Sequence, residues 1–253
     1  MMKRVICIML GLFLMSGTTA AQEKQEKKKT GELTDPVEIL KKVDAAAKAV
    51  KAVKYDVTYE QTGGPGEGMK LKASITHVGY VDGGPEKGFV EVEYTQPDSK
   101  EVRKLTSGTD GEMFYVIDHK AKKAYEDIDP AVVGSFRRTL LTGVMFEFIH
   151  PTPFSDEIKG KEQKLKGSKK INGEDCYEIS VVYAVEQAPK AVWCFSKKDF
   201  LPRQRIDSYS SPGRGTMTMT KTISKLTVDP KLGKDAFKLK LPKGYTKTDD
   251  FAP

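Results

Sequence analysis

The sequence predicts a mainly β domain of the α+β class, in which an antiparallel sheet of about ten to eleven strands carries a few helices. Runs with an apolar residue at every second position fill most of the 253-residue chain. Turn signals rich in glycine, asparagine and aspartate separate these runs, as in antiparallel hairpins. Helix signals are confined to a few segments, and the two longest begin with an Asp-Pro pair, at Asp35 and at Asp129.

The first residues have the order of a secretory signal peptide. A short basic start, residues 1–4, is followed by an apolar run, residues 5–15, and by small residues at 16–21. The apolar run is shorter than the roughly 20 residues that span a bilayer, so we interpret residues 1–21 as a cleaved signal peptide. Cys7 lies inside the apolar run and does not have the position of a lipidated cysteine. We therefore expect an exported periplasmic protein that is soluble and carries no lipid anchor.

The composition predicts a linker followed by one domain. Residues 22–34 are charged and almost free of apolar residues, so we interpret them as a disordered linker before a single domain over residues 35–250. The chain has 42 Lys and Arg and 35 Asp and Glu, with a formal net charge of +7. The two signs are interleaved, whereas a nucleic-acid-binding surface clusters basic residues on one element. We expect a monomer without a nucleic-acid partner.

The first helix and the first hairpin have clear signals. Asp35, Pro36 and Glu38 are suited to the cap, the first turn and the capping-box position of a helix. From residue 54 the apolar period changes to two, which predicts a strand. The run GGPGEG, residues 63–68, lacks the Lys-Ser/Thr ending of a phosphate-binding loop and joins two strands, so we interpret it as a hairpin loop. The apolar stripe of the helix is Ile39, Val43, Ala46, Val50 and Val53.

The remaining elements follow from the same signals. Asp129-Pro130 predicts the start of a second helix, which Gly143 ends, and residues 154–158 suit a short further helix. Asn172-Gly173 is a strong signal for a tight turn. Further strands are expected at residues 69–75, 89–94, 101–106, 113–117, 124–126, 176–183, 191–195, 204–208, 217–228 and 237–241.

Two cysteines delimit the stretch CYEISVVYAVEQAPKAVWC, which has the pattern of a hairpin. A register that pairs Tyr177 with Trp193 joins the apolar faces and sets Cys176 directly opposite Cys194. Directly opposed cysteines of an exported protein are close enough for a disulfide. Two unbridged cysteines are the alternative, and a redox pair would need the spacing Cys-x-x-Cys.

The sequence contains no recognisable constellation of reactive residues. His77, His119 and His150 are scattered over separate elements without the spacing of metal ligands. The motifs Gly-x-Ser-x-Gly and His-x-x-Glu-His are absent, and Asp35 and Asp129 are explained as helix caps. We therefore expect no metal, no cofactor and no catalysis.

The ordered set of elements resembles the LolA/LolB/RseB superfamily of periplasmic lipid and lipoprotein carriers. The resemblance covers about residues 33–245, and the NGEDCY and VWCF pieces are more similar to another exported branch than to LolA itself. The stretches that carry it are DPVEILKKVDAAAKAVKAVKYDVTYE, DGEMFYVIDHKAKKAYEDIDP, INGEDCYEIS, AVWCFSKKDFLPRQRIDSY and VDPKLGKDAFKLKLPKGY.

The resemblance implies an incomplete antiparallel barrel wrapped around helices, with an apolar cavity for acyl chains. The alternative, from the residue pattern alone, is an ordinary closed core. The sequence leaves open whether Arg103, Arg203 or Arg205 faces inward to hold the lid or outward to meet headgroups. The candidate cavity lining is Tyr55, Val57, Tyr59, Leu71, Ile75, Val92, Tyr94, Tyr177, Ile179, Trp193 and Phe195. The candidate lid is Phe136, Leu140, Met145, Phe146 and Phe148.

These observations together predict a non-catalytic periplasmic carrier of lipids or lipidated proteins. Its expected partners are lipid or lipoprotein acyl chains and an envelope membrane protein. An envelope sensor or adaptor that binds a protein partner, as RseB-type members do, is the alternative. An envelope hydrolase is the least favoured function.

Overall fold

One twelve-stranded sheet organises the described part of this computed structural model, which comprises residues 32–79, 87–95, 101–129, 137–185, 187–211, 213 and 215–249. The described residues from Leu33 onwards belong to one compact unit. The predicted signal peptide and residues 22–31 of the predicted linker lie outside the described residues.

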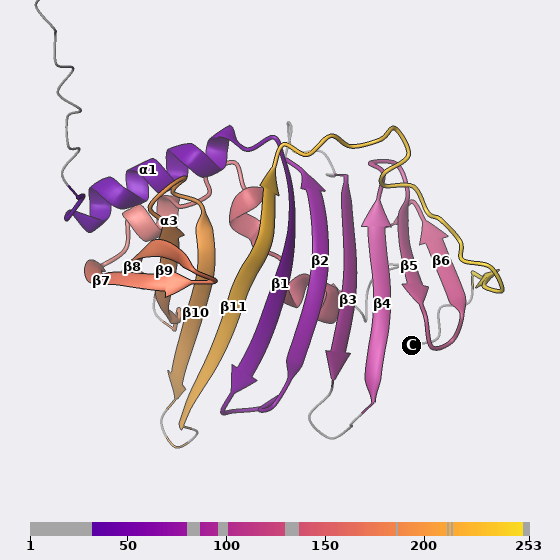
Figure 1. Cartoon of the computed structure of the whole chain (residues 1–253). Coiled ribbons are helices and arrows are strands. Elements are labelled where there is room, and N and C mark those ends of the chain that lie inside the picture. Colours follow the sequence, from indigo (N-terminus) through magenta and orange to yellow (C-terminus); the bar gives the residue numbers. More distant parts are fainter. Residues whose placement is uncertain are drawn as a thin grey trace, which may run out of the picture. The chain divides into compact units, whose positions relative to one another are not determined.

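The sheet is open, and its strand order places the two halves of the chain side by side (Figure 1). The order is β12-β6-β5-β4-β3-β2-β1-β11-β10-β9-β8-β7, antiparallel except for the pair of β12 and β6. The first strands are β1 (Ala52–Thr62), β2 (Lys70–Val78), β3 (Gly88–Thr95), β4 (Val102–Thr109), β5 (Phe114–Asp118) and β6 (Lys123–Asp127). The others are β7 (Glu162–Ile171), β8 (Glu174–Val182), β9 (Lys190–Ser196), β10 (Pro202–Ser211), β11 (Gly215–Val228) and β12 (Thr246–Lys247).

The predicted fold class is confirmed, with two corrections: β7 was not expected as a strand, and the expected C-terminal strand is absent. The expected strand at residues 237–241 does not form, and the last strand is β12. Residues 237–241 run across the sheet between Pro230 and Pro242, and Leu239 packs on a small apolar cluster of β5 and β6. Side-chain packing therefore holds this segment, where a ladder of backbone hydrogen bonds had been expected.

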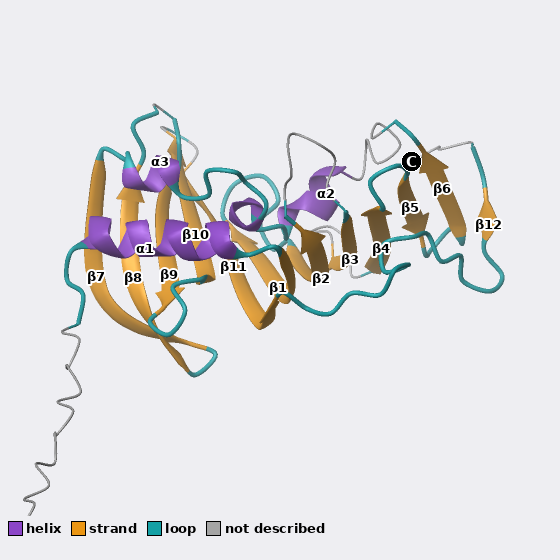
Figure 2. Ribbon diagram, turned by 90° about the horizontal axis from the view of Figure 1, so that it is seen from above, coloured by secondary structure: helices purple, strands orange, loops and turns teal. Residues whose placement is uncertain are grey.

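Helices lie along the sheet from β7 to β3 (Figure 2). Helix α1 (Pro36–Ala49) starts as predicted, since Asp35 Oδ1 accepts a hydrogen bond from Val37 N at 2.8 Å. Figure 2 shows α1 and α3 (Ser155–Ile158) on the side of β7–β10, and α2 (Arg137–Thr142) near β2 and β3. The expected start of the second helix at Asp129-Pro130 leads into residues 130–136, which lie outside the described residues. The buried residues of α1 are Ile39, Leu40, Val43 and Ala47.

The predicted hairpin turns are present. Asn172 and Gly173 have φ values of 49° and 84°, as a two-residue turn between β7 and β8 requires. The run of residues 63–68 joins the antiparallel strands β1 and β2. Asp118 Oδ1 accepts hydrogen bonds from the backbone N–H groups of Lys120 and Ala121, at 2.8 and 3.1 Å, and so holds the turn before β6.

The predicted register of the cysteine hairpin is wrong by two residues. Ile179 pairs with Trp193, while Cys176 lies opposite Ser196 and Cys194 opposite Glu178. A shift of two keeps each side chain on its face, so the apolar faces still coincide. The cysteines are therefore diagonal neighbours rather than directly opposed, and both are free and buried in a small cluster with Ile171.

Alternation along the strands divides the sheet into an apolar and a polar face. The apolar face contributes most of the main hydrophobic cluster, to which α1 adds Ile39, Leu40 and Val43. We call it the core face. The opposite face carries polar side chains at the alternate positions, such as Lys54, Asp56 and Ser74.

His77 is a buried polar residue of β2, paired with Val53 and Gly88. Its Nε2 has no hydrogen-bond partner among the described residues, and burial lowers the pKa of the imidazole to about 4. The folded pKa lies below the unfolded value, so the neutral imidazole favours the fold fully above about pH 6.5, and this contribution is lost as the pH falls towards 4. We expect a loss of about 3 kcal/mol in unfolding free energy between pH 7 and pH 4 from this residue alone.

Urea unfolding of the native protein and of His77→Leu at both pH values measures this effect. The leucine variant is expected to lose less stability on acidification, by about 3 kcal/mol. An equal pH dependence of the two proteins would contradict the assignment.

Candidate functional site

The predicted cavity-lining residues all lie on the core face, where they are buried. The most exposed of them, Tyr177, has 6% of its surface accessible, and Ile75, Val92, Ile179 and Trp193 have none. They belong to one cluster that also contains residues of α1 and of the segment 143–160. In this structure the predicted lining is therefore packed core, covered by other parts of the chain.

The segment 143–160, called the lid segment below, covers the core face between α1 and α2. It contains a short 3-10 turn, η2 (Phe146–Phe148), and helix α3. Of the predicted lid residues, Met145 and Phe148 are buried in the main cluster, and Phe146 is 45% exposed. Phe136 and the side chain of Leu140 lie outside the described residues.

Polar side chains of the core face fasten the lid segment to the sheet. Lys221 Nζ donates to the carbonyl oxygen of Val144 at 3.1 Å, and the Tyr55 hydroxyl accepts from Met145 N at 2.9 Å. Arg205 Nη1 pairs with Glu147 Oε1 at 2.5 Å. These contacts fix the start of the lid segment, whereas its end is fixed where Tyr183 donates to Glu157 at 2.6 Å.

Arg205 occupies the centre of this polar group. Its guanidinium lies 4.7 Å from the centroid of the Trp193 ring, and its Nε pairs with Asp207 at 2.8 Å. Burial opposes the charge, but the carboxylates of Glu147 and Asp207 outweigh it and raise the pKa of Arg205. Burial also lowers the pKa of the neighbouring Lys221. The lid segment is thus held by charged groups within an otherwise apolar face.

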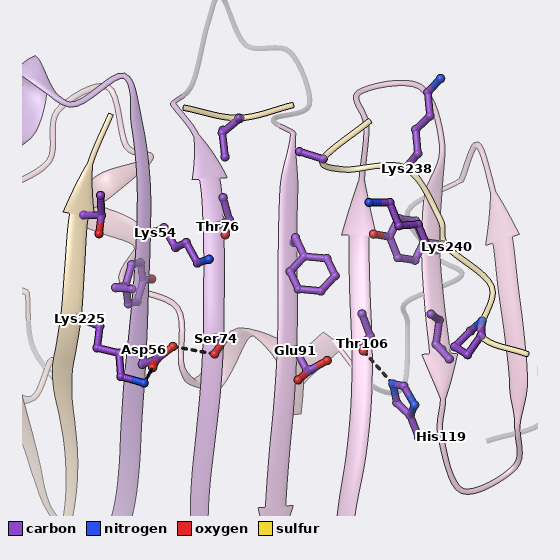
Figure 3. A pocket seen from close by; sticks show the side chains of 18 residues that line it. Lys54, Asp56, Ser74, Thr76, Glu91, Thr106, His119, Lys225, Lys238 and Lys240 are labelled. Atoms are coloured by element: carbon purple, nitrogen blue, oxygen red, sulfur yellow. Dashed lines mark hydrogen bonds and ion pairs between the residues drawn. The ribbon is translucent and has the colours of Figure 1, made fainter. Parts of the chain in front are cut away.

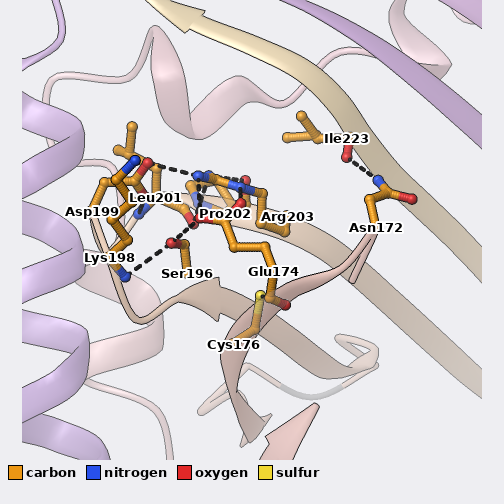
Figure 4. Close-up of polar contacts among 10 residues, drawn as sticks. All are labelled: Asn172, Glu174, Cys176, Ser196, Lys198, Asp199, Leu201, Pro202, Arg203 and Ile223. Atoms are coloured by element: carbon orange, nitrogen blue, oxygen red, sulfur yellow. Dashed lines mark hydrogen bonds and ion pairs between the residues drawn. The ribbon is translucent and has the colours of Figure 1, made fainter. Parts of the chain in front are cut away.

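Sequence reasoning left the direction of the arginines open, and the structure separates their roles. Arg205 faces inward and holds the lid segment. Arg203 joins Glu174 and Asp199 through ion pairs of 2.7 and 2.6 Å, which tie the β9–β10 turn to β8 (Figure 4). Arg103 pairs with Asp118 at 3.3 Å. Sequence reasoning did not assign Arg205, Asp207 and Lys221 to the core face; the signal for them was charged residues at alternate positions of two expected strands, β10 and β11.

A pocket of about 620 Å³ opens beside the lid segment, between η2, α3, the β8–β9 connection and β10. We call it the mouth pocket. Its lining includes Phe146, Val185 and Tyr209, which are 45%, 73% and 37% exposed. Arg205 and Glu147 also line it, so the ion pair that holds the lid segment lies at the pocket. Its volume is typical of pockets for small ligands.

The described residues contain no group of His, Cys, Asp and Glu side chains that could hold a metal ion. None of the described helices is long and apolar enough to cross a membrane.

Comparison with known proteins found similar solved structures and one family. The search of curated proteins returned no match. MucB is 13% identical, with a TM-score of 0.49 over 81% of this chain and 63% of MucB, so this chain spans less than two thirds of that protein. LprF from Mycobacterium bovis is 11% identical, with a TM-score of 0.47 over 84% of this chain and 99% of LprF.

The LolA superfamily, which the sequence resembles, is represented among the similar structures. Its member from Nitrosomonas europaea is 13% identical, with a TM-score of 0.35 over 82% of this chain and 98% of that chain. A family model described as "Predicted periplasmic protein (DUF2092)" matches residues 84–249, more than half of the sequence. The chain therefore belongs to this family of predicted periplasmic proteins.

Proposed function

We propose that this protein binds the acyl chains of a lipid or of a lipidated protein on the core face of its sheet, and carries them in the periplasm without catalysis. The chains enter at the mouth pocket, and the lid segment moves aside. The observation that carries the proposal is the position of the mouth pocket: exposed apolar side chains surround an opening at the ion pair of Arg205 and Glu147, which holds the lid segment on an apolar face.

The free energy that holds the lid segment on the core face and the free energy gained by burying an acyl chain there are of similar size. The buried side chains of Val144, Met145, Phe148 and Phe154 contribute about 1.5–3 kcal/mol each, and the contacts from Lys221, Tyr55 and Arg205 about 1–3 kcal/mol each. An acyl chain of about 14 methylenes gains about 11 kcal/mol when it is buried at about 0.8 kcal/mol per methylene. Burial of an acyl chain therefore offsets a large part of the free energy that release of the lid segment costs.

Native mass spectrometry of the protein purified from a periplasm tests the proposal. We expect a stoichiometric adduct that organic extraction releases as a lipid or an acylated species. The triple variant Phe146→Ser, Val185→Ser, Tyr209→Ser removes the apolar rim at exposed positions and is expected to lower uptake of a fluorescent phospholipid from vesicles. The matched control Val102→Ser changes an apolar residue that is 63% exposed and does not line the mouth pocket.

A protein without an adduct, and without uptake in the native or any variant form, would overturn the carrier function. That result would favour the adaptor function, in which the same surface binds a protein partner. A rim variant that takes up the lipid as fast as the Val102→Ser control would contradict entry at the mouth pocket.

Gly143 lies so close to the sheet that a larger side chain at this position should displace the lid segment. A Cβ atom at Gly143 would lie 3.0 Å from Val57 Cγ1 and 3.3 Å from Leu71 Cδ2. We expect Gly143→Val to cost about 1–3 kcal/mol of stability and to displace the lid segment, because the packed core face cannot yield to the added methyl groups. Proteolysis within residues 143–160 and lipid uptake should both become faster.

Gly233→Val is the matched control, since a Cβ atom at Gly233 meets nothing within 4 Å. The lid hypothesis fails if Gly143→Val folds and yet has the protease pattern and the uptake rate of this control.

A further inference from the structure

The polar face of the sheet is crossed by the C-terminal segment 229–245, which we call the strap (Figure 1). At its start, Asp229 Oδ1 accepts hydrogen bonds from the backbone N–H groups of Lys51 and Ala52, each at 2.9 Å. At its end, Tyr245 packs on the apolar cluster of β5 and β6, and β12 follows beside β6. The strap is thus anchored at both ends and spans the strands between them.

A cavity of about 810 Å³ lies between the strap and the polar face. We call it the strap cavity. Its floor comes from β11 and β1–β5, and its roof includes Leu232, Ala236 and Pro242 of the strap. His119 joins floor and strap, since its Nε2 lies 2.9 Å from Thr106 Oγ1 and its Nδ1 3.0 Å from the Tyr245 hydroxyl oxygen. The lid segment and the mouth pocket lie on the other face and do not contribute to this lining.

The carboxylates of the floor are already neutralised. Asp56 pairs with Lys225 at 2.8 Å and accepts a hydrogen bond from Ser74 at 2.6 Å, and both hydrogen bonds lower the pKa of the Asp56 carboxyl group. Glu91 pairs with Lys104 at 2.8 Å. The cavity therefore offers no free negative charge from these two residues.

A β-bulge brings Lys225 to Asp56. Lys54 pairs with Thr227 and Asp56 with Ser224, so that Lys225 and Leu226 together lie opposite one residue of β1. Lys225 has a φ of 51°, a left-handed conformation that is uncommon for a lysine. The bulge places Lys225 in this less favourable backbone conformation, and its side chain thereby reaches the cavity floor.

Two lysines of the lining remain without an ion pair to any other described residue, and they lie apart (Figure 3). Lys54 belongs to β1, and Lys240 belongs to the strap on the side of β4 and β5. Phe89 of β3 lines the cavity between these strands. Lys238 points away from the floor and pairs with Asp235 at 2.9 Å. A lysine without an ion pair therefore stands towards each end of a partly apolar cavity, and the charge of Lys54 also helps to lower the pKa of Asp56.

We propose that the strap cavity binds an elongated dianion with an apolar middle. One negative group meets Lys54, the other meets Lys240, and the apolar part lies across the strands on Phe89 and Tyr115. Neighbouring strands are about 4.8 Å apart and β4 lies three spacings from β1, so a ligand about 14 Å long can extend from one lysine towards the other. A dicarboxylate with a hydrocarbon chain is the simplest compound of this class.

Isothermal titration of the full mature chain with dodecanedioate tests the site. Dodecanoate, which has one charge, and dodecane-1,12-diol, which has none, are the matched probes. We expect one dodecanedioate to bind, at least tenfold tighter than the diol. Lys54→Met and Lys240→Met should each weaken dodecanedioate binding about tenfold, the ratio that one charge-assisted hydrogen bond supplies. Lys234→Met is the control, because this strap lysine does not line the cavity.

The outcomes separate this site from the proposed carrier site. Binding of dodecanedioate that survives the triple rim variant of the mouth pocket, and weakens in Lys54→Met and Lys240→Met, supports the strap cavity. The proposal is overturned if the native protein does not bind dodecanedioate, if the two lysine variants bind it like Lys234→Met, or if the rim variant abolishes binding.

Discussion

Replacing Arg205 by methionine is expected to lower the free energy of unfolding by about 3–5 kcal/mol, because removal of one member of a buried ion pair leaves its partners uncompensated. The side chains of Glu147 and Asp207 are 10% and 8% exposed, so water does little to replace the lost guanidinium. Methionine keeps much of the apolar contact with the Trp193 ring. The substitution therefore mainly removes the positive charge. Urea unfolding monitored by circular dichroism measures the effect.

The double variant Arg205→Met, Glu147→Gln tests the reason for the loss. It removes one of the stranded charges and is expected to regain part of the stability. Arg103→Met is the control, since that arginine is 30% exposed and its single ion pair to Asp118 is 3.3 Å long. If Arg205→Met costs no more than Arg103→Met, the polar group under the lid segment does not hold it.

Trp193→Ala is expected to cost about 3–5 kcal/mol through the cavity that it leaves under the lid segment. The indole is fully buried, its ring centroid lies 5.5 Å from that of Phe195 and 5.3 Å from that of Phe154, and Arg205 covers its face. These neighbours belong to different strands and to the lid segment, so they cannot all close the space. Thermal unfolding followed by circular dichroism measures the loss, since the variant has no tryptophan to report it.

A cavity of this kind is expected to take up a small apolar molecule. Benzene should therefore raise the melting temperature of Trp193→Ala and leave that of the native protein unchanged. Phe146→Ala is the matched control, because this aromatic residue of the lid segment is 45% exposed and its removal should change stability by about 0.5 kcal/mol or less. Equal losses in the two variants would show that the core face is not close-packed at Trp193.

Alternation along the strands was enough to predict which residues share a face, but not what covers that face. Tyr55, Ile75 and Ile179 alternate with polar residues whether they line an open cavity or pack under a lid segment. The distinction depends on residues 143–160, whose path is set by the long-range contacts of Tyr55, Lys221 and Arg205. The sequence shows these as interruptions of an apolar pattern and does not identify their partners.

Turn chemistry explains why one hairpin turn was predictable and the register of another hairpin was not. Asn172-Gly173 has the two positive φ values that a tight turn needs, and the turn then determines how β7 and β8 pair. The connection between β8 and β9 has no such signal, and side-chain parity allows any even shift. Residues 237–241 were mistaken for a strand because Phe237, Leu239 and Leu241 alternate, although Leu239 packs on side chains of β5 and β6 and Leu241 is 45% exposed.

The antiparallel pairing of β1 with β11 affects the order in which the sheet folds. Strands β1 to β6 pair with their sequence neighbours, as do β7 to β11, so each half assembles through short loops. Joining the halves requires Val57 to meet Ile223 across most of the sequence, which carries the largest loop-closure entropy of the sheet. During folding, one edge of β1 therefore stays unpaired until β11 forms, and during that interval it can pair with a strand of another chain.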